Sequence, residues 1–241
     1  MRNRFTRACY AVAAVVAVTT TLGLSAAGAA DASTTHVKPN ATPSCGDGCF
    51  NLFNLKYTPD FVQTSIGGHS KVGNMIGLTQ ASNNAPSQDF VANEVGLVTV
   101  MCDNWPAPGS LSPNSYACLN YAFPYYLFGV FEANYSPLGS PTDLCAGLAK
   151  PAFPWEEVTL QRCGSLESEW VPDTYNFASY FLGLLNVVPW INASDTPSSH
   201  PLVLTATRTR HHPLAVSPER KYSDGTVIDT QQFGIIPGVL P

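Results

Sequence analysis

Charged residues are scarce in this sequence. Only 12% of its 241 residues are Asp, Glu, Lys or Arg, whereas a typical globular protein has roughly 25%. The formal net charge of −5 argues against a basic surface for nucleic acids. The hydrophobic fraction of 45% is ordinary, so the chain can bury a core and wholesale disorder is excluded. With so few ionisable side chains, acid–base catalysis has few candidate residues.

The motifs of common enzyme classes and metal sites are also missing. No HExxH, GxSxG, phosphate-binding loop or dinucleotide-binding glycine pattern occurs. There is no CxxC pair, and the spacing of the histidines does not indicate a metal site. The adjacent acids Glu156 and Glu157 would point to opposite faces of a strand. We therefore expect no cofactor, no metal and no enzymatic activity; an extracellular hydrolase with carboxylates from distant positions stays open.

The N-terminus has the features of a secretory signal peptide. Arg2, Arg4 and Arg7 precede an apolar run from Ala8 to about Leu24, and small residues follow at 25–30. We predict a signal peptide at 1–30, a flexible leader at 31–44 and a single domain at 45–241. Removal of residues 1–30 deletes three arginines and no acid, which lowers the formal charge from −5 to −8. The expected product is a secreted protein with no affinity for nucleic acid or membranes.

Six cysteines remain once the signal peptide, which contains Cys9, is set aside. An even number in an exported chain indicates disulfides. Pairing in sequence order closes only short loops and is the pairing we favour, although the sequence leaves others open. The expected disulfide cysteines are Cys45, Cys49, Cys102, Cys118, Cys145 and Cys163.

The distribution of apolar residues predicts a mostly β protein. Frequent Pro and Gly separate short segments rich in Val, Ile, Phe and Tyr, and no convincing amphipathic helix occurs. Segment 180–188 is compatible with a strand or a short helix. The clearest predicted strands are 95–101, 157–161, 202–205 and 226–229.

Three segments share a pattern in which a short apolar strand precedes a polar-x-aromatic triplet. The triplets end at Phe90, Trp170 and Phe233. The closing aromatics are 80 and 63 positions apart, so any repeat is irregular. Large side chains of this kind anchor cores, and we expect all three to be buried. The pattern predicts a threefold repeat.

The middle segment resembles a repeat of the ricin-B-type β-trefoil lectins. It contains Asp143-Leu-Cys145, then Val158-Thr-Leu160, Cys163 and Trp170, where the family has an early Cys-Leu-Asp, a Val-x-Leu strand, a second Cys and a closing Gln-x-Trp. A first unit would begin at Cys49. The chain also resembles a group of secreted actinobacterial proteins of unassigned function, which share the Cys-Gly-x-Gly-Cys start and the Val-Thr-Leu-Gln-x-Cys-Gly segment. The resemblance implies an all-β, elaborated β-trefoil-like domain with long loops and disulfides.

The resemblance also implies where sugars would bind. The family uses an early Asp, an aromatic after the Val-x-Leu strand and an Asn-Gln pair before the closing aromatic, and no unit here is complete. In the second unit Gly147 replaces the Asp and Gln161 the aromatic. The remaining candidate ligand-binding residues are Asn51, Gln88 and Gln231. We therefore expect a non-catalytic recognition module for an extracellular glycan, with degenerate sugar sites.

Two other features suggest a different partner. Seven aromatic residues crowd into 116–131, and we expect them to alternate into the core rather than form an exposed face. Proline-rich loops at 106–113 and 197–213 would suit a protein-interaction or inhibitor module that binds a secreted protein. A basic stretch that includes Arg208, Arg210, Arg220 and Lys221 is interpreted as an exposed loop.

Overall fold

The computed structural model describes residues 49–57, 61–83, 85–121, 129–173, 187–195, 200–207 and 213–237. All of them belong to the unit His36–Pro241. The predicted signal peptide at 1–30 and the predicted leader at 31–44 lie outside the described residues and stay predictions.

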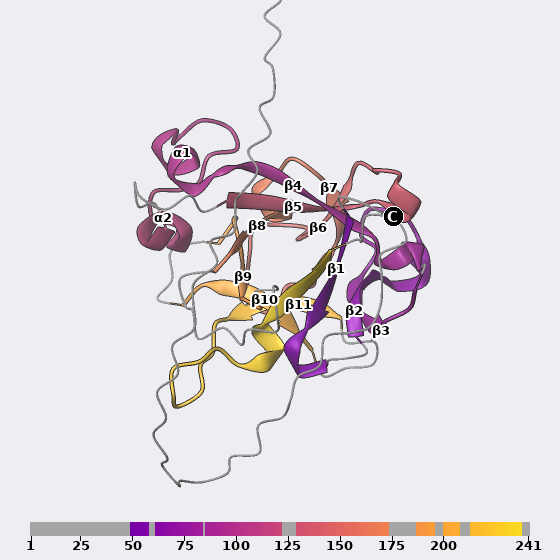
Figure 1. Ribbon diagram of the computed structural model, residues 1–241. Coiled ribbons are helices and arrows are strands. Elements are labelled where there is room, and N and C mark those ends of the chain that lie inside the picture. Colours follow the sequence, from indigo (N-terminus) through magenta and orange to yellow (C-terminus); the bar gives the residue numbers. More distant parts are fainter. Residues whose placement is uncertain are drawn as a thin grey trace, which may run out of the picture. The chain divides into compact units, whose positions relative to one another are not determined.

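The described residues form twelve strands that pair antiparallel throughout (Figure 1). They fall into three consecutive sets of four. The first set is β1 (Cys49–Asn54), β2 (Phe61–Ser65), β3 (Ile76–Gln80) and β4 (Phe90–Leu97). The second is β5 (Gly129–Tyr135), β6 (Leu144–Gly147), β7 (Thr159–Arg162) and β8 (Glu169–Pro172). The third is β9 (Trp190–Asn192), β10 (Leu202–Ala206), β11 (Leu214–Pro218) and β12 (Phe233–Pro237).

Strand pairing repeats in the same way in each set. The outer strands form a ring in which β1 pairs with β4, β4 with β5, β5 with β8, β8 with β9 and β12 with β1. A single bridge between Val188 and Phe233 connects β12 to the segment before β9. The middle strands form the hairpins β2–β3, β6–β7 and β10–β11. The bridges Met75–Thr159, Glu157–Ala215 and Gly77–Pro213 connect the hairpins pairwise. This is an all-β, trefoil-like fold.

Each repeat closes with the same short turn. The 3-10 turns η3 (Pro86–Gln88), η5 (Leu166–Ser168) and η6 (Asp229–Gln231) are each followed by a backbone N–H that donates to the first carbonyl of the turn. The closing aromatics Phe90, Trp170 and Phe233 then enter the core, where each is buried. The prediction that these three residues are core anchors is confirmed.

The largest core cluster draws equivalent residues from all three repeats. Alternation along the strands of a half-buried sheet directs one face of every hairpin toward this cluster. Leu78, Leu160 and Val216 occupy matching register positions opposite β2, β6 and β10. The core is therefore shared by the three repeats, so none of them is expected to fold alone.

An insertion between β4 and β5 departs from the threefold pattern. It contains α1 (Val98–Asp103) and α2 (Tyr116–Tyr121), visible in Figure 1 beside the end of β4. The predicted strand 95–101 is wrong in its second half, where the chain becomes helical. The burial pattern explains this, because Val98 and Met101 are buried at helical spacing while Val100 is exposed. Segment 180–188 lies mostly outside the described residues.

Two disulfides stabilise the described residues. Cys102–Cys118 connects α1 to α2, and Cys145–Cys163 connects β6 to the residue after β7. Both follow the sequential pairing expected above. Cys49 is also disulfide-bonded, and Cys45 lies outside the described residues. Disulfides are typical of proteins in an oxidising compartment.

Candidate functional site

The side chain of Gln88 is buried at the end of the first repeat. Its Nε2 donates to the carbonyl of Gln80 at 2.9 Å, and its Oε1 accepts the N–H of Ser82 at 3.3 Å. These two bonds hold the end of β3. The amide of Gln88 is thus an internal hydrogen-bonding group of the scaffold.

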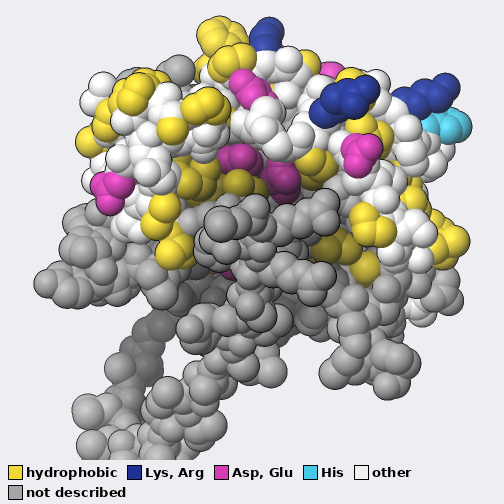
Figure 2. Space-filling view, turned by 90° about the horizontal axis from the view of Figure 1, so that it is seen from above, with side chains coloured by type: hydrophobic (Ala, Val, Ile, Leu, Met, Phe, Trp, Pro, Cys, Tyr) yellow, Lys and Arg dark blue, Asp and Glu magenta, His cyan; other side chains and the backbone are white. Residues whose placement is uncertain are grey.

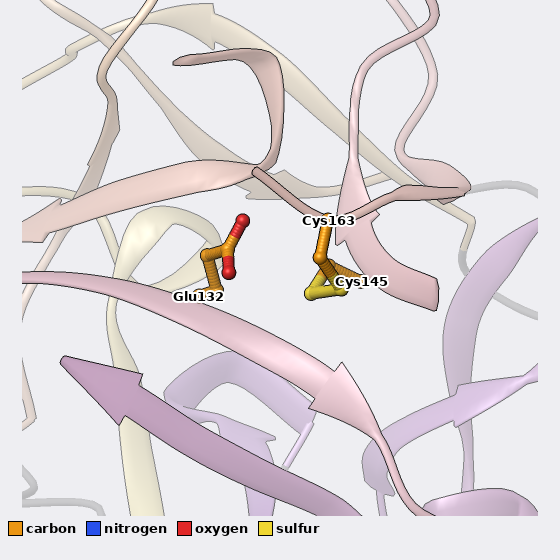
Figure 3. Close-up of side chains that lie close together, drawn as sticks. All are labelled: Glu132, Cys145 and Cys163. Atoms are coloured by element: carbon orange, nitrogen blue, oxygen red, sulfur yellow. A yellow bond between two sulfur atoms is a disulfide. The ribbon is translucent and has the colours of Figure 1, made fainter. Parts of the chain in front are cut away.

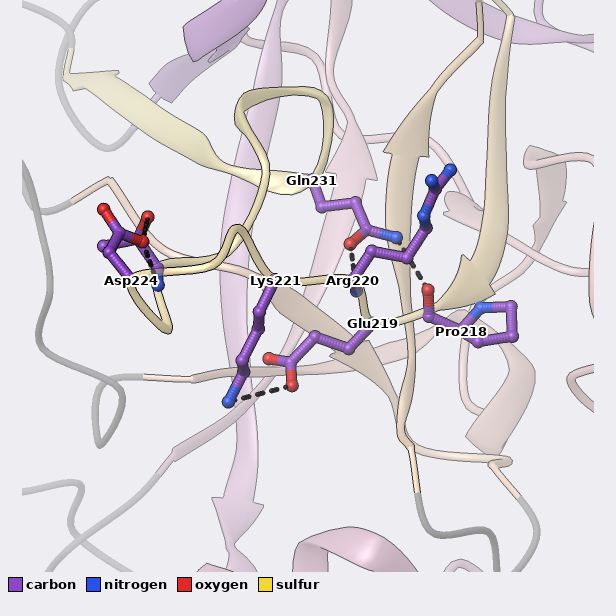
Figure 4. Close-up of polar contacts among 7 residues, drawn as sticks. Pro218, Glu219, Arg220, Lys221, Asp224 and Gln231 are labelled. Atoms are coloured by element: carbon purple, nitrogen blue, oxygen red, sulfur yellow. Dashed lines mark hydrogen bonds and ion pairs between the residues drawn. The ribbon is translucent and has the colours of Figure 1, made fainter.

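Gln231 has the same role in the third repeat. Its Nε2 donates to the carbonyl of Pro218 at 2.9 Å, and its Oε1 accepts the N–H of Arg220 at 2.7 Å (Figure 4). The amide also contacts the hydroxyls of Thr205 and Ser217 at 3.2 and 2.9 Å. Gln231 differs from Gln88 in one respect, because it lines a cleft.

Asn51 lies in β1, where its side chain is buried and its Nδ2 donates to the carbonyl of Gln88 at 2.5 Å. It therefore belongs to the first strand of its repeat, whereas Cys145 belongs to the second strand of the next one. The first repeat does begin at Cys49, but Cys49 and Cys145 are not equivalent in the fold, so Asn51 does not hold the place of the early Asp. The three candidate residues do not converge on one site.

The second repeat has a small cleft of about 290 Å³, lined in part by Leu148, Gln161, Arg162 and Glu167. It has no space for an early acidic side chain. A Cβ added at Gly147 would lie 2.8 Å from the backbone oxygen of Glu167. The cleft therefore lacks both the acid and the aromatic that the family uses.

The equivalent cleft of the third repeat is larger, at about 560 Å³. Its floor is formed by polar residues of β10, β11 and η6, and its edges come from other segments of the chain. No acidic residue is among the described residues that line it. The lining residues are Lys56, Trp155, Thr205, Ala206, Thr207, Ser217, Arg220, Tyr222, Ile228, Thr230 and Gln231.

Trp155 is the most unusual residue of this cleft. Its backbone has a φ of +69°, in the left-handed region that a bulky side chain rarely adopts. Its N–H donates to the carbonyl of Val216 in β11 at 2.6 Å, which fixes the conformation. Its side chain is 61% exposed. In the first repeat, Gly73 also has a positive φ and donates the matching bond to Leu160, so this turn is repeated and Trp155 places an exposed indole on it at a cost in strain.

Tyr222 supplies a second exposed aromatic ring. It begins a tight hairpin in which its N–H donates to the carbonyl of Thr226 at 2.7 Å. Asp224 accepts hydrogen bonds from the N–H and hydroxyl of Thr226, and these lower the pKa of its carboxyl (Figure 4). Gly225 adopts a φ of +87°, which the turn requires. The hairpin therefore holds Tyr222 at the cleft.

A metal centre finds no support among the described residues. The one cluster of potential ligands found there consists of Glu132, Cys145 and Cys163 (Figure 3). Both sulfurs are already joined in a disulfide, so they are not available as thiolates. The carboxylate of Glu132 instead accepts the N–H of Gly164.

A pair of carboxylates also lies in the interior of the described residues. Glu132 and Glu169 are opposite each other on β5 and β8, and both are buried. Burial, followed by the charges of Glu132 and Glu167, raises the pKa of Glu169 to about 7. Neither Glu132 nor Glu169 lines the second-repeat or the third-repeat cleft. This pair is therefore part of the interior.

The structure describes only the two ends of the aromatic-rich segment 116–131. Tyr121 is buried in the cluster formed by the α1–α2 insertion, and Tyr116 packs edge-on against it. Residues 122–128, which hold four of the seven aromatics, lie outside the described residues. Figure 2 shows acidic and basic side chains scattered among uncharged ones on the described part of one face. Among the described helices, none is long and apolar enough to cross a membrane.

No protein-family model matches the sequence, and no curated protein matches it. Among solved structures, the designed threefold symmetric protein ThreeFoil aligns with a TM-score of 0.48 and 10% identity, over 79% of this chain and 99% of that one. A mosquitocidal holotoxin aligns with a TM-score of 0.47 and 13% identity, over 79% of this chain and 17% of that one. The SDF2-like protein from Arabidopsis thaliana aligns with a TM-score of 0.42 and 10% identity, over 81% and 96%.

Proposed function

We propose that this protein is a secreted, non-catalytic recognition module that binds an extracellular carbohydrate in the cleft of the third repeat. The observation that carries the proposal is the exposed indole of Trp155, held at the cleft by a left-handed backbone. A fixed aromatic face can stack on the apolar face of a sugar ring without losing conformational freedom on binding.

The other groups in the cleft suit the same ligand. Sugar hydroxyls need hydrogen-bonding partners beside the stacking surface. Thr207 and Thr230 provide hydroxyls, and the exposed ring of Tyr222 provides a second face. A cleft of about 560 Å³ has the size of a small-molecule site and accommodates a short oligosaccharide.

A glycan array combined with retention on insoluble polysaccharides tests the proposal. We expect binding by the wild-type protein and a loss of roughly five- to thirtyfold in Trp155→Ala, since an aromatic contact in a binding centre is worth roughly 1–2 kcal/mol. Phe153→Ala is the matched control. Phe153 lies two residues earlier and is 65% exposed, but it does not line the cleft.

Retention on no glycan, or equal binding by Trp155→Ala and wild type, would refute the proposed site. Secretion is tested separately, by sequencing the N-terminus of the protein recovered from culture medium. A mature chain that begins at Asp31 would support the predicted cleavage.

A second candidate function is protein binding by the α1–α2 insertion. Val100, Trp105 and Leu119 are all exposed there, although each is large and apolar. The loop 106–113 between the helices is ordered by hydrogen bonds such as that from the N–H of Leu111 to the carbonyl of Met101, at 3.1 Å. Loop 197–213 lies partly outside the described residues. Co-purification of a secreted partner that Trp105→Ala abolishes and Trp155→Ala retains would favour this function.

A further inference from the structure

The third-repeat cleft carries a positive charge in a protein whose formal charge is negative. Lys56 and Arg220 both line it, and both are exposed. The described lining includes no Asp or Glu to offset them. A cleft lined by charges of one sign attracts ligands of the opposite sign.

The acidic groups closest in sequence to Arg220 have other partners. The carboxylate of Glu219 lies 3.3 Å from the ammonium of Lys221, and Asp224 caps its own turn. Figure 4 shows the side chain of Arg220 extending away from the Glu219–Lys221 pair. Within the described part of the chain, the guanidinium of Arg220 and the ammonium of Lys56 form no ion pair.

Two buried side-chain amides hold the backbone at Lys56 and at Arg220. The N–H of Lys56 donates to the Oδ1 of Asn54 at 3.1 Å, and the N–H of Arg220 donates to the Oε1 of Gln231 at 2.7 Å. Asn54 and Gln231 are fully buried. Gln231 is therefore a positioning residue for a cation at the edge of the cleft.

The same backbone positions in the other repeats are uncharged. The N–H of Arg220 donates to Gln231. At the same place, the N–H of Ser82 donates to Gln88 in the first repeat, and the N–H of Gly164 donates to Glu132 in the second. Ser194 donates to Asn192 as Lys56 does to Asn54, also at 3.1 Å. Lys56 and Arg220 therefore occur only at the third-repeat cleft among these positions. The hydrogen bonds that the repeats share form without a charged side chain, so the fold does not require either cation.

We propose that the third-repeat cleft selects an anionic sugar, whose acidic group lies between Lys56 and Arg220 while its ring stacks on Trp155. This inference rests on the proposed carbohydrate-binding function and names its ligand class. A sugar with either a carboxylate or a sulfate group would suit the cleft, because guanidinium and ammonium groups form charge-assisted hydrogen bonds with both anions.

Calorimetric titration with matched oligosaccharides tests the proposal. The probes are an oligosaccharide of galacturonic acid, the same oligosaccharide with its carboxyl groups reduced to alcohols, and a sulfated derivative of the reduced form. The variants are Lys56→Gln and Arg220→Gln. Lys71→Gln removes the same charge from an exposed residue that lines neither cleft, and is the control.

We expect at least one acidic probe to bind about tenfold or more tightly than the reduced probe, since a hydrogen bond to a charged group is worth roughly 1.5–3 kcal/mol. Lys56→Gln and Arg220→Gln should remove that preference and its dependence on salt, and Lys71→Gln should retain both. A preference for the sulfated probe alone would support an anionic ligand and assign the anion as sulfate.

Equal binding of all three probes, with Trp155→Ala still defective, would overturn the anionic ligand and leave the proposed function in place. An acidic preference that survives both cleft variants would also overturn it. No binding of any probe or arrayed glycan would overturn both proposals.

Discussion

The carboxylate of Glu132 accepts a hydrogen bond from the backbone N–H of Gly164 at 2.5 Å. In the other two repeats the corresponding N–H is bound by the amide oxygen of Gln88 or Gln231. The second repeat has Ser168 at that place, whose side chain is too short to reach. Glu132 replaces the missing amide from the neighbouring strand and also accepts the hydroxyl of Ser168 at 2.8 Å.

This arrangement predicts that Glu132→Ala is strongly destabilising. It would remove the acceptor of the N–H of Gly164, and it would leave the hydroxyl of Ser168 with the carbonyl of Ser165 alone. We expect the free energy of unfolding in urea to fall by roughly 1.5–3 kcal/mol, as for a lost hydrogen bond to a charged group. Glu94→Ala, an exposed acid on the adjacent β4, is the control and should change it by less than about 0.5 kcal/mol.

A rescue sharpens this test. Adding Ser168→Gln to Glu132→Ala supplies the side-chain amide that accepts the corresponding N–H in the other repeats. The double variant should therefore recover part of the lost free energy of unfolding. A destabilisation by Glu132→Ala no larger than that of Glu94→Ala would contradict the replacement role.

The raised pKa of Glu169 predicts that stability depends on pH. Below pH about 4.5 the carboxyl is protonated in both the folded and unfolded states. Between pH about 4.5 and about 7 the unfolded state loses the proton first, so the free energy of unfolding falls as pH rises. The total decrease is roughly 3 kcal/mol. Urea denaturation from pH 4.5 to 8.5 should show this slope in the wild type. Glu169→Gln should reduce it, and the part that is left comes from Glu219, whose pKa burial also raises.

Removal of the Cys145–Cys163 disulfide should destabilise the whole domain, because it connects the two sides of the β6–β7 hairpin, which contributes to the shared core. The bond closes a loop with a sequence separation of 18, for which the chain-entropy model predicts about 3 kcal/mol. The double variant C145S/C163S should therefore shift the urea midpoint downward. In C102S/C118S, where the separation is 16, hydrogen exchange should increase first in α1 and α2.

The backbone of Trp155 allows a test of strain. Glycine adopts a positive φ without the penalty of a Cβ, so Trp155→Gly should be about 1 kcal/mol more stable than Trp155→Ala. Phe153 has no positive φ, and there the order should reverse. Both Trp155 variants should lose glycan retention. Equal stability of the two Trp155 variants in thermal denaturation would show that the left-handed backbone is not retained.

The sequence predicts the parts of the fold that depend on local chemistry. Phe90, Trp170 and Phe233 are large apolar residues at a repeated position, and their burial follows from size. The register of the strands cannot be predicted in this way, because it depends on hydrogen bonds between strands that are distant in sequence. Cys49 and Cys145 look equivalent in sequence, but one lies in the first strand of its repeat and the other in the second. Asn51 therefore could not be assigned correctly from spacing.

The candidate site is even less accessible to sequence analysis. Lys56, Trp155 and Tyr222 come from three different repeats, and only the closed ring brings them to one cleft. The positive φ of Trp155 has no signature in its neighbours other than Pro154. Gln231 was identifiable from its place before Phe233, but its contact with Arg220 depends on the folded hairpin.

The pairing of β1 with β12 has a mechanical consequence. Residues 50–54 and 233–237 form five register pairs, so the first and last strands of the domain lie in one ladder. A force that separates the two ends of the chain would act on this ladder before it reached the hairpins. Lys56 follows β1 and Thr230 precedes β12, so the same separation would pull the cleft apart. If the cleft binds the proposed glycan, an occupied cleft should therefore raise the force at which the domain opens, and stretching the domain should release the glycan.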